Sequence, residues 1–209
     1  MAEIKVKKFL TALKNMGIDS YISNGENMPT LHALHKTVKG CRKCSLADTR
    51  KTVVFGEGND KARLVFIGEA PGEEEDNQGR PFVGRAGKLL DKMIEGIGLR
   101  REEVYICNVL KCRPPNNRDP KPDEAEVCKH YLISQLEIIS PKIICTLGKH
   151  AYNTILGIDE SIIKIRGTLT RYKGIKLLPT YHPSFLLRNA GRMNEALEDM
   201  ETLKHLLRQ

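Results

Sequence analysis

The sequence predicts an α/β protein, a three-layer α/β/α sandwich with a central, mostly parallel four-stranded sheet. Three short apolar segments have the length and composition of buried strands, at residues 63–68, 104–110 and 142–148. Longer segments with apolar residues at helical spacing separate them. Strands that alternate with helices form largely parallel sheets covered on both faces, so this alternation predicts the architecture.

The first forty residues differ in character from the rest. Apolar residues recur at helical spacing over residues 9–16 and stop at Gly17, and residues 31–38 predict a second short helix. Residues 1–40 are therefore expected to form an N-terminal helical extension. Residues 41–209 are long enough for one domain with its own core.

The remaining elements follow in order. Residues 84–97 predict an amphipathic helix after the first strand. Pro122 opens a helix that runs to about residue 139, and a further helix follows the third strand. Residues 162–171 and 176–180 predict a β-turn-β pair that supplies the fourth core strand. Residues 194–207 predict a closing helix.

Charge and termini limit the possible partners and location. The chain has 34 Lys and Arg against 26 Asp and Glu, a net charge of +8, which suits a phosphate-rich partner without establishing one. The N-terminus lacks the apolar stretch of a secretory signal, and no apolar run is long enough to span a bilayer. We expect a cytoplasmic protein with no membrane contact. Neither end carries a convincing sliding-clamp motif.

Six cysteines in an intracellular chain indicate metal ligation or burial more than disulfides. Cys41 and Cys44 form a C-x2-C pair that can place two thiolates on one metal, and Cys112 and Cys128 can complete the set. Four thiolates fit either zinc or a [4Fe–4S] cluster, so both remain open on spacing alone. The other two cysteines, at positions 107 and 145, lie in apolar strands and are expected to be small buried hydrophobes.

Four segments follow the carboxyl ends of the predicted strands, where α/β sheets bind ligands: residues 69–72, the loop after Asn108, Gly148 and residues 182–184. Asn108 interrupts an apolar strand, and its amide offers one donor group and one acceptor, which matches the N3–H and O4 edge of uracil. It could equally bond backbone. Phe82, in a Gly-rich loop, could stack on a base or cap the core.

Basic and apolar side chains near the same edge suit nucleic acid. Residues 111–118 are basic and stiffened by two prolines, which is typical of a phosphate-contacting loop or of a polar surface loop. His182 could stabilise an anionic leaving group, although a lone histidine is more often structural. An exposed apolar residue among 185–187 could wedge into the base stack, although such residues usually belong to a core.

These segments together resemble family 4 of the uracil-DNA glycosylase superfamily, its iron–sulfur branch. The resemblance runs from about Cys41 to the C-terminus and rests on four ordered motifs: GEAPGEEED (68–76), GRPFVGRAG (79–87), NVLKCRPPNNRDP (108–120) and HPSFLLRN (182–189). It implies a monofunctional hydrolase, a base-excision repair enzyme that flips uracil out of single- or double-stranded DNA. Water then attacks C1′ and leaves an abasic site. It also suggests a monomer.

The resemblance further implies roles for single residues. It implies a [4Fe–4S] cluster on Cys41, Cys44, Cys112 and Cys128, and a uracil pocket of Glu69, Ala70, Phe82, Asn108 and His182. Glu69, Glu75, Asn117 and His182 are the expected catalytic residues, and Arg113, Arg118, Ser184, Leu186 and Arg188 the expected DNA contacts. Ala70 stands where the best-known branch has an Asp that positions water, so no single general base is named.

Three other interpretations stay open at this stage. The first is a superfamily member that takes hypoxanthine or xanthine, against which Phe82 and Asn108 argue. The second is a non-catalytic iron–sulfur module that binds DNA, which would need neither Asn108 nor His182. The third is a structural zinc protein, which would be colourless.

Overall fold

A computed structural model describes residues 30–209 of the chain, so the helix predicted at residues 9–16 lies outside the described residues. The strands are β1 (Glu57–Gly58), β2 (Leu64–Gly68), β3 (Tyr105–Asn108), β4 (Ile143–Leu147), β5 (Thr170–Tyr172) and β6 (Ile175–Thr180). The helices are α2 (Leu31–Lys39), α3 (Leu46–Thr49), α4 (Glu73–Gln78), α5 (Arg85–Gly96), α6 (Pro122–Ile139), α7 (Lys149–Leu156), α8 (Ile162–Ile165), α9 (Pro183–Arg188) and α10 (Met193–Leu207). Short 3-10 turns are η2 (Arg101–Glu103), η3 (Pro115–Asn117) and η4 (Ala190–Arg192).

The sheet has six strands in the order β1-β3-β2-β4-β6-β5, which corrects the predicted number of four. The four central strands pair in parallel, as the sequence predicted, and β1 and β5 add antiparallel edges. The edge strand β1 was missed because two residues, only partly buried, carry no period-two apolar pattern, whereas β5 was predicted as the end of the first strand of the β-turn-β pair.

The predicted strand over residues 162–171 is wrong in its first half, which forms helix α8. A short segment with three isoleucines around Lys164 fits a strand or a helical turn equally well, and here Ile165 is buried while Gly167 turns the chain at φ +68°. Only Thr170–Tyr172 pairs with β6 as a hairpin. The predicted helices at α2, α5, α6 and α10 are confirmed within one or two residues.

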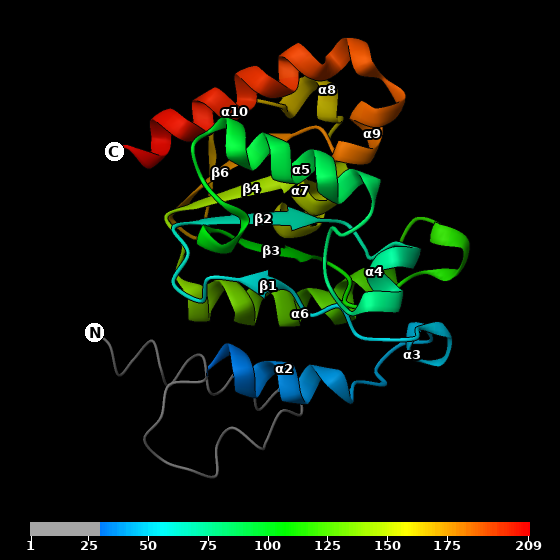
Figure 1. The fold of residues 1–209 in the computed structure, drawn as a ribbon. Coiled ribbons are helices and arrows are strands. Elements are labelled where there is room, and N and C mark those ends of the chain that lie inside the picture. Colours follow the sequence, from blue (N-terminus) through cyan, green and yellow to red (C-terminus); the bar gives the residue numbers. More distant parts are fainter. Residues whose placement is uncertain (1–29) are drawn as a thin grey trace.

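Two layers of helices cover the sheet. Side chains of alternating orientation in β2 divide between them: Leu64 and Phe66 pack with α5 and α10, whereas Val65 and Ile67 pack with α6 and α7. Figure 1 shows α5 and α10 on one side of the sheet and α6 on the other, with α2 alongside α6. None of the helices in residues 30–209 has the length and hydropathy needed to cross a membrane.

A third, smaller core lies under α2 and holds the cysteines. Leu34 and Val38 of α2 are buried against Leu110, Cys112 and Cys128. Helix α2 begins at the Thr30 cap, whose hydroxyl accepts a hydrogen bond from the N–H of Ala33. The part of the predicted extension that is described thus packs directly on the domain that follows it.

Candidate functional site

The carboxyl ends of the four parallel strands share one edge of the sheet, and a pocket of about 590 Å³ opens there. All four segments that the sequence singled out reach it. Its wall is formed by Glu69, Ala70, Pro71, Gly72, Glu75, Phe82, Ala86, Asn108, Pro114, Asn117, Arg118, Asp119, Leu147, Gly148, Lys149, His150, Ile162, Tyr181, His182, Ser184, Phe185 and Arg188.

Asn108 ends β3 beside Gly68, its partner in the parallel ladder. The side chain is buried, and within residues 30–209 its Oδ1 has no hydrogen-bond partner. A buried carbonyl oxygen without a donor costs about 1–3 kcal/mol, so such an atom on a pocket wall is a site for a donor from a ligand. A Cβ on residue 68 would lie 2.3 Å from this Oδ1 and 2.6 Å from Phe82 Cζ, so only glycine leaves the pocket intact.

Phe82 forms another part of the wall. Its ring is almost fully buried, and its centroid lies 5.5 Å from that of His182 with the ring planes tilted by 35°. Its backbone has φ +52°, a left-handed conformation that side chains larger than glycine rarely adopt. The surrounding residues therefore hold this ring in place at a cost in backbone strain.

His182 caps the N-terminus of α9. Its Nδ1 accepts a hydrogen bond from the Ser184 N–H at 3.1 Å and lies 2.7 Å from the Ser184 Oγ. Burial, and then the positive charge of Arg188, lowers the pKa of His182 to about 4. The imidazole is therefore neutral at pH 7, and because Nδ1 accepts the backbone hydrogen bond we assign the ring proton to Nε2, which makes Nε2 a donor.

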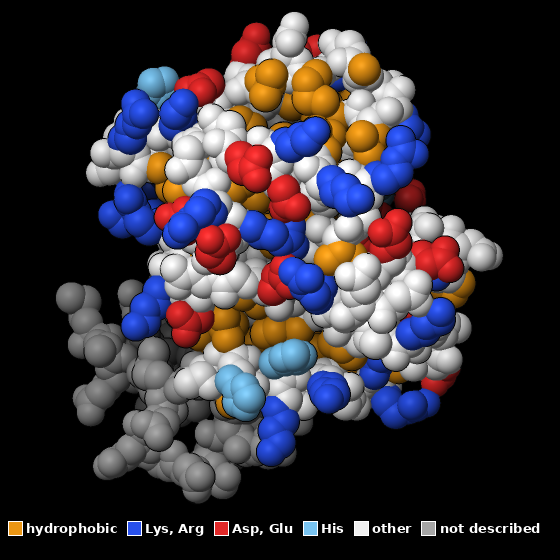
Figure 2. Space-filling model, viewed as in Figure 1, with side chains coloured by type: hydrophobic (Ala, Val, Ile, Leu, Met, Phe, Trp, Pro, Cys, Tyr) orange, Lys and Arg blue, Asp and Glu red, His pale blue; other side chains and the backbone are white. Residues whose placement is uncertain are grey.

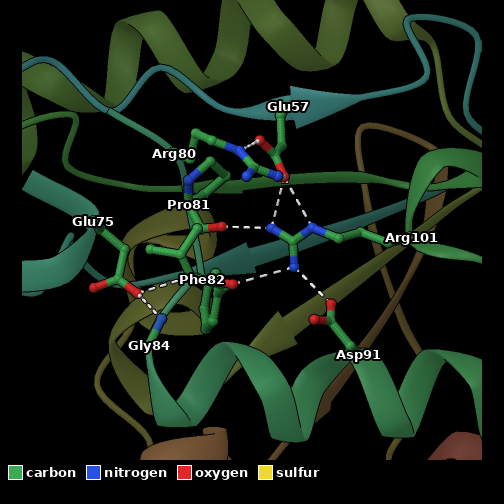
Figure 3. A network of polar contacts seen from close by, with 9 residues as sticks. Glu57, Glu75, Arg80, Pro81, Phe82, Gly84, Asp91 and Arg101 are labelled. Carbon is green, nitrogen blue, oxygen red and sulfur yellow. Dashed lines mark hydrogen bonds and ion pairs between the residues drawn. The ribbon is translucent and has the colours of Figure 1, made fainter. Parts of the chain in front are cut away.

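Glu75 lies in α4, so the acidic run after β2 is helical and not the solvated loop that such a run usually forms. Its Oε1 accepts hydrogen bonds from the N–H groups of Val83 and Gly84 at 2.9 and 3.0 Å, and its Oε2 accepts from Gly72 at 3.1 Å. Figure 3 shows the bonds to the Phe82 loop. Glu75 thus reaches the pocket while tying two loops together.

Glu69 is the half-buried acid of the pocket. Burial, more than any charge, raises its pKa, and the carboxylate of Asp119 adds to the rise while His150 opposes it. His150 Nε2 lies 3.9 Å from a carboxylate oxygen of Glu69 and equally far from one of Asp119. The backbone carbonyl of Glu69 accepts from the Leu110 N–H, which places this residue beside the end of β3.

The basic loop after β3 divides into buried and exposed parts. Lys111 is fully buried, and its Nζ donates to the Asn108 carbonyl at 2.7 Å and to Gln135 Oε1 at 2.6 Å, so it makes no phosphate contact and the prediction is wrong at this residue. Arg113 Nε donates to Asn117 Oδ1 at 2.8 Å. Arg118 pairs with the buried Glu124 at 2.6 Å.

The apolar side chains of α9 also differ from the prediction. Leu186 is buried in the core, only 1% exposed, and cannot act as a wedge in this conformation, because the turn of α9 points it at the sheet. Leu187 is the exposed neighbour, at 42%. Arg188 and Ser184, by contrast, lie on the pocket wall.

The four cysteines that the sequence grouped belong to the core under α2. Cys112 and Cys128 are buried, and Cys41 and Cys44 are partly buried beside them. Burial raises the pKa of the Cys128 thiol to about 12, so thiolates here require positive charge nearby. Arg50 Nη1 donates to Cys112 Sγ at 3.2 Å, and the Lys111 N–H donates to Cys128 Sγ at 3.3 Å.

These surroundings fit an anionic iron–sulfur group. In the described part of the chain Lys111 Nζ bonds only neutral oxygens, and burial lowers its pKa, so a nearby anion would offset the cost of burying its charge. N–H groups that point at cysteine sulfur are also the usual partners of cluster ligands. Cys107 and Cys145 are fully buried in the sheet, as predicted.

Three residues near the site were not found from the sequence. Arg50 donates to Cys112 Sγ, Arg101 donates to the Pro81 and Phe82 carbonyls, and His150 lines the pocket. Basic residues outside a motif resemble surface charges in sequence. Lys111 was predicted only as part of a phosphate-contacting loop, and its burial beside the cysteines was missed. The face in Figure 2 shows Lys and Arg interspersed with Asp and Glu, so on this face the positive charge is not gathered in one patch.

Comparisons with known proteins give the family of the chain. A family model described as the uracil DNA glycosylase superfamily matches residues 55–202. A type-4 uracil-DNA glycosylase of Thermotoga maritima is 50% identical over 184 residues, which cover 85% of this chain and 95% of that relative. The type-4 enzyme of Saccharolobus solfataricus is 48% identical over 189 residues (86% and 88% of the two chains), and that of Archaeoglobus fulgidus is 44% identical over 187 (86% and 94%).

Proposed function

The chain belongs to the uracil-DNA glycosylase superfamily, and from this premise we propose that its pocket takes up a uracil flipped out of DNA and holds it for hydrolysis of the bond to its sugar. Its type-4 relatives are named for this activity, a hydrolysis of N-glycosyl bonds that serves DNA repair. The observation that carries the proposal for this pocket is the buried Asn108 Oδ1 without a partner.

Asn108 distinguishes uracil from cytosine by the positions of hydrogen-bond donors and acceptors on the base. Its Oδ1 accepts from uracil N3–H, and its Nδ2 donates to uracil O4. Cytosine presents an acceptor at N3 and a donor at N4, so both contacts would be mispaired in a buried site, which costs several kcal/mol. The ring of Phe82 stacks on the base held in this way, and the segment around Ala70 closes the other side of the pocket.

His182 stabilises the leaving group. When the C1′–N1 bond breaks, the electron pair leaves with uracil, and negative charge develops on O2. The neutral imidazole donates its Nε2–H to that oxygen, and because the imidazole is uncharged before the reaction, this bond strengthens mainly in the transition state. A neutral donor needs no compensating anion in the buried pocket.

Water completes the reaction at C1′. The carboxylates of Glu69 and Glu75 stabilise the cationic sugar, and with Asn117 they orient the attacking water. One of these pocket carboxylates accepts the proton of this water, and burial raises the pKa of Glu69, which makes it the stronger base. The oxygen bonds to C1′, the departing uracil anion is protonated from solvent, and an abasic site remains.

A [4Fe–4S] cluster on Cys41, Cys44, Cys112 and Cys128 serves a structural purpose in this proposal. Bound there, it supplies four cross-links between the loop after α2, the loop after β3 and helix α6. Lys111 and Cys112 lie at the start of the 111–118 loop, so the cross-links fix the loop that carries Asn117 into the pocket. Acid-labile sulfide and iron in the purified protein distinguish the cluster from zinc.

DNA contacts complete the proposal. Arg113, Arg118, Ser184 and Arg188 lie at or near the pocket, where each offers a donor to backbone phosphate, and Leu187 replaces Leu186 as the exposed apolar side chain. The enzyme is expected to act as a monomer on single- or double-stranded DNA, in the cytoplasm.

The test is cleavage of an oligonucleotide with one central uracil by anaerobically purified protein, followed by alkali to break abasic sites. The same strand with cytosine, thymine or hypoxanthine serves as the control. A break in the uracil lane alone, lost in Asn108→Ala, is expected. A break at hypoxanthine would indicate a wider base range, and no break in any lane from protein with full iron content would indicate a DNA-binding module.

A further inference from the structure

Arg101 lies in η2, outside the four motifs, yet its guanidinium contacts the loop that carries Phe82. Nη2 donates to the Pro81 carbonyl at 2.5 Å, and Nη1 donates to the Phe82 carbonyl at 3.2 Å. The same guanidinium is oriented by Glu57 at 2.8 Å and Asp91 at 2.7 Å. Figure 3 shows it between the two acids and the loop. Its side chain is only 20% exposed, so these bonds are largely shielded from water.

The other side of Phe82 is held by the opposite charge. The Glu75 carboxylate accepts from the N–H groups of Val83 and Gly84. A cation therefore binds the two carbonyls at positions 81 and 82, and an anion binds the next two N–H groups. Charge-assisted hydrogen bonds of this kind are shorter and stronger than neutral ones.

The backbone of Phe82, which lies between these contacts, is strained. Phe82 has φ +52°, which an aromatic residue adopts only when its surroundings impose it. Helix α5 packs on the same carbonyl, because a Cβ on residue 87 would lie 1.9 Å from the Phe82 oxygen and Gly87 alone permits the approach. Release of the carbonyls would let the backbone relax and move the ring away from the pocket wall.

We propose that Arg101 is a positioning residue that fixes Phe82 in its strained conformation and thereby sets the affinity of the pocket for the flipped base. The inference rests on the proposed stacking role of Phe82. Arg101 does not touch the base and acts through the ring.

Arg80 provides a matched control within the same network. Its guanidinium donates twice to Glu57, at 2.8 and 3.1 Å, and in residues 30–209 it makes no hydrogen bond to the Pro81 or Phe82 carbonyl. Its side chain is 58% exposed. Arg80→Gln therefore removes a guanidinium from Glu57 and one unit of charge, as Arg101→Gln does, but leaves the two carbonyl bonds in place.

The experiment measures inhibition by free uracil and single-turnover cleavage of the uracil oligonucleotide for Arg101→Gln, Arg80→Gln, Phe82→Ala and the Arg101→Gln/Phe82→Ala double variant. We expect Arg101→Gln to weaken free-uracil binding and to lower the single-turnover rate at subsaturating protein roughly tenfold, and Arg80→Gln to change neither by more than about twofold. In the Phe82→Ala background, Arg101→Gln should add little, because both substitutions remove the same contact.

Two results would overturn the inference. The first is wild-type uracil affinity in Arg101→Gln, and the second is an equal effect of Arg101→Gln with and without the Phe82 ring. If Phe82→Ala itself leaves uracil affinity unchanged, the proposed stacking role of Phe82 is wrong, and the inference about Arg101 is wrong with it. This outcome differs from the first two, which contradict the role of Arg101 alone. Arg101→Lys keeps the charge but cannot bind both carbonyls and both acids, so its uracil affinity and cleavage rate should lie between those of wild type and Arg101→Gln. This variant replaces Arg101→Gln in the experiment if Arg101→Gln does not fold.

Discussion

Gly68 lies where the side chains of Asn108 and Phe82 converge. Asn108 and Phe82 approach it from two sides, and any side chain would collide with both. The amide proposed to read the base and the ring proposed to stack on it thus lie against a glycine at the end of β2. The positions of single atoms therefore determine the shape of the site. The tautomer of His182 also depends on a single contact, because its Nδ1 accepts a hydrogen bond from the Ser184 N–H.

His182 should make stability depend on pH between about 4 and 6.5. In this range the unfolded chain binds a proton at this histidine that the folded chain, with its pKa of about 4, does not. Stability is therefore complete above pH 6.5 and falls as the pH is lowered. Between pH 7 and pH 5 we expect wild type to lose about 2 kcal/mol more of its unfolding free energy than His182→Gln.

Urea unfolding at the two pH values measures this difference. His205→Gln is the matched control, because His205 is exposed in α10 and remote from the pocket wall. An identical loss in wild type and in His182→Gln would contradict a neutral, buried His182. Above pH 5 the rate of base excision should likewise not follow a group that titrates at the ordinary histidine pKa.

Helix α6 carries Cys128, one of the proposed cluster ligands, and its N-terminus is held by one carboxylate. Glu124 is fully buried, accepts from the Lys121 N–H at 2.9 Å and pairs with Arg118. This arrangement caps the helix one turn before Cys128 and fixes the end of the 111–118 loop. The Arg118 side chain lowers the pKa of Glu124, which keeps the carboxylate charged.

Glu124→Gln should loosen this end of α6 and release iron. Loss of the cap and of the ion pair is expected to cost about 1–2 kcal/mol and to speed the loss of visible absorbance in the presence of an iron chelator several-fold. Glu126→Gln removes an exposed acid two residues further along, paired with Lys129, and should leave the rate unchanged. Equal rates in both variants would show that the cap does not support the cluster.

For the whole molecule, the net charge of +8 is distributed over a surface on which both signs alternate on the face in Figure 2. Long-range attraction to DNA therefore comes from the sum of charges, whereas orientation depends on the few cations beside the pocket. Arg188 is one of these, since it lines the pocket at the end of α9.

Arg188→Gln should lower the slope of log Kd against log salt by about one, because one phosphate contact is lost. Arg171→Gln changes the net charge equally but lies in edge strand β5, away from the pocket wall, and should leave the slope as it is. Binding of a uracil oligonucleotide between 50 and 200 mM salt provides the comparison. Equal slopes in the two variants would assign the DNA contact elsewhere.

Much of the fold could be predicted from local pattern. The four central strands are short apolar runs, and the helices α5, α6 and α10 have apolar residues at helical spacing over many residues. Such patterns predict the element whatever the tertiary arrangement in which it is buried. The edge strand β1, the start of β5 and the helix α8 could not be predicted, because short, half-buried segments take their conformation from their neighbours. The four motifs predicted the pocket residues, but Leu186 shows that a motif does not determine which of two adjacent leucines is exposed.

The sequence by itself determined the α/β class, the carboxyl-edge location of the site, the four-cysteine set and the resemblance that the comparisons bear out. These depend on residue type and order along the chain. Only the tertiary structure decided that Lys111 is buried beside the cysteines, that Glu75 holds the Phe82 loop and that Arg101 reaches two carbonyls of that loop. Contacts between segments far apart in sequence depend on how the helices pack on the sheet, and no local pattern records that packing.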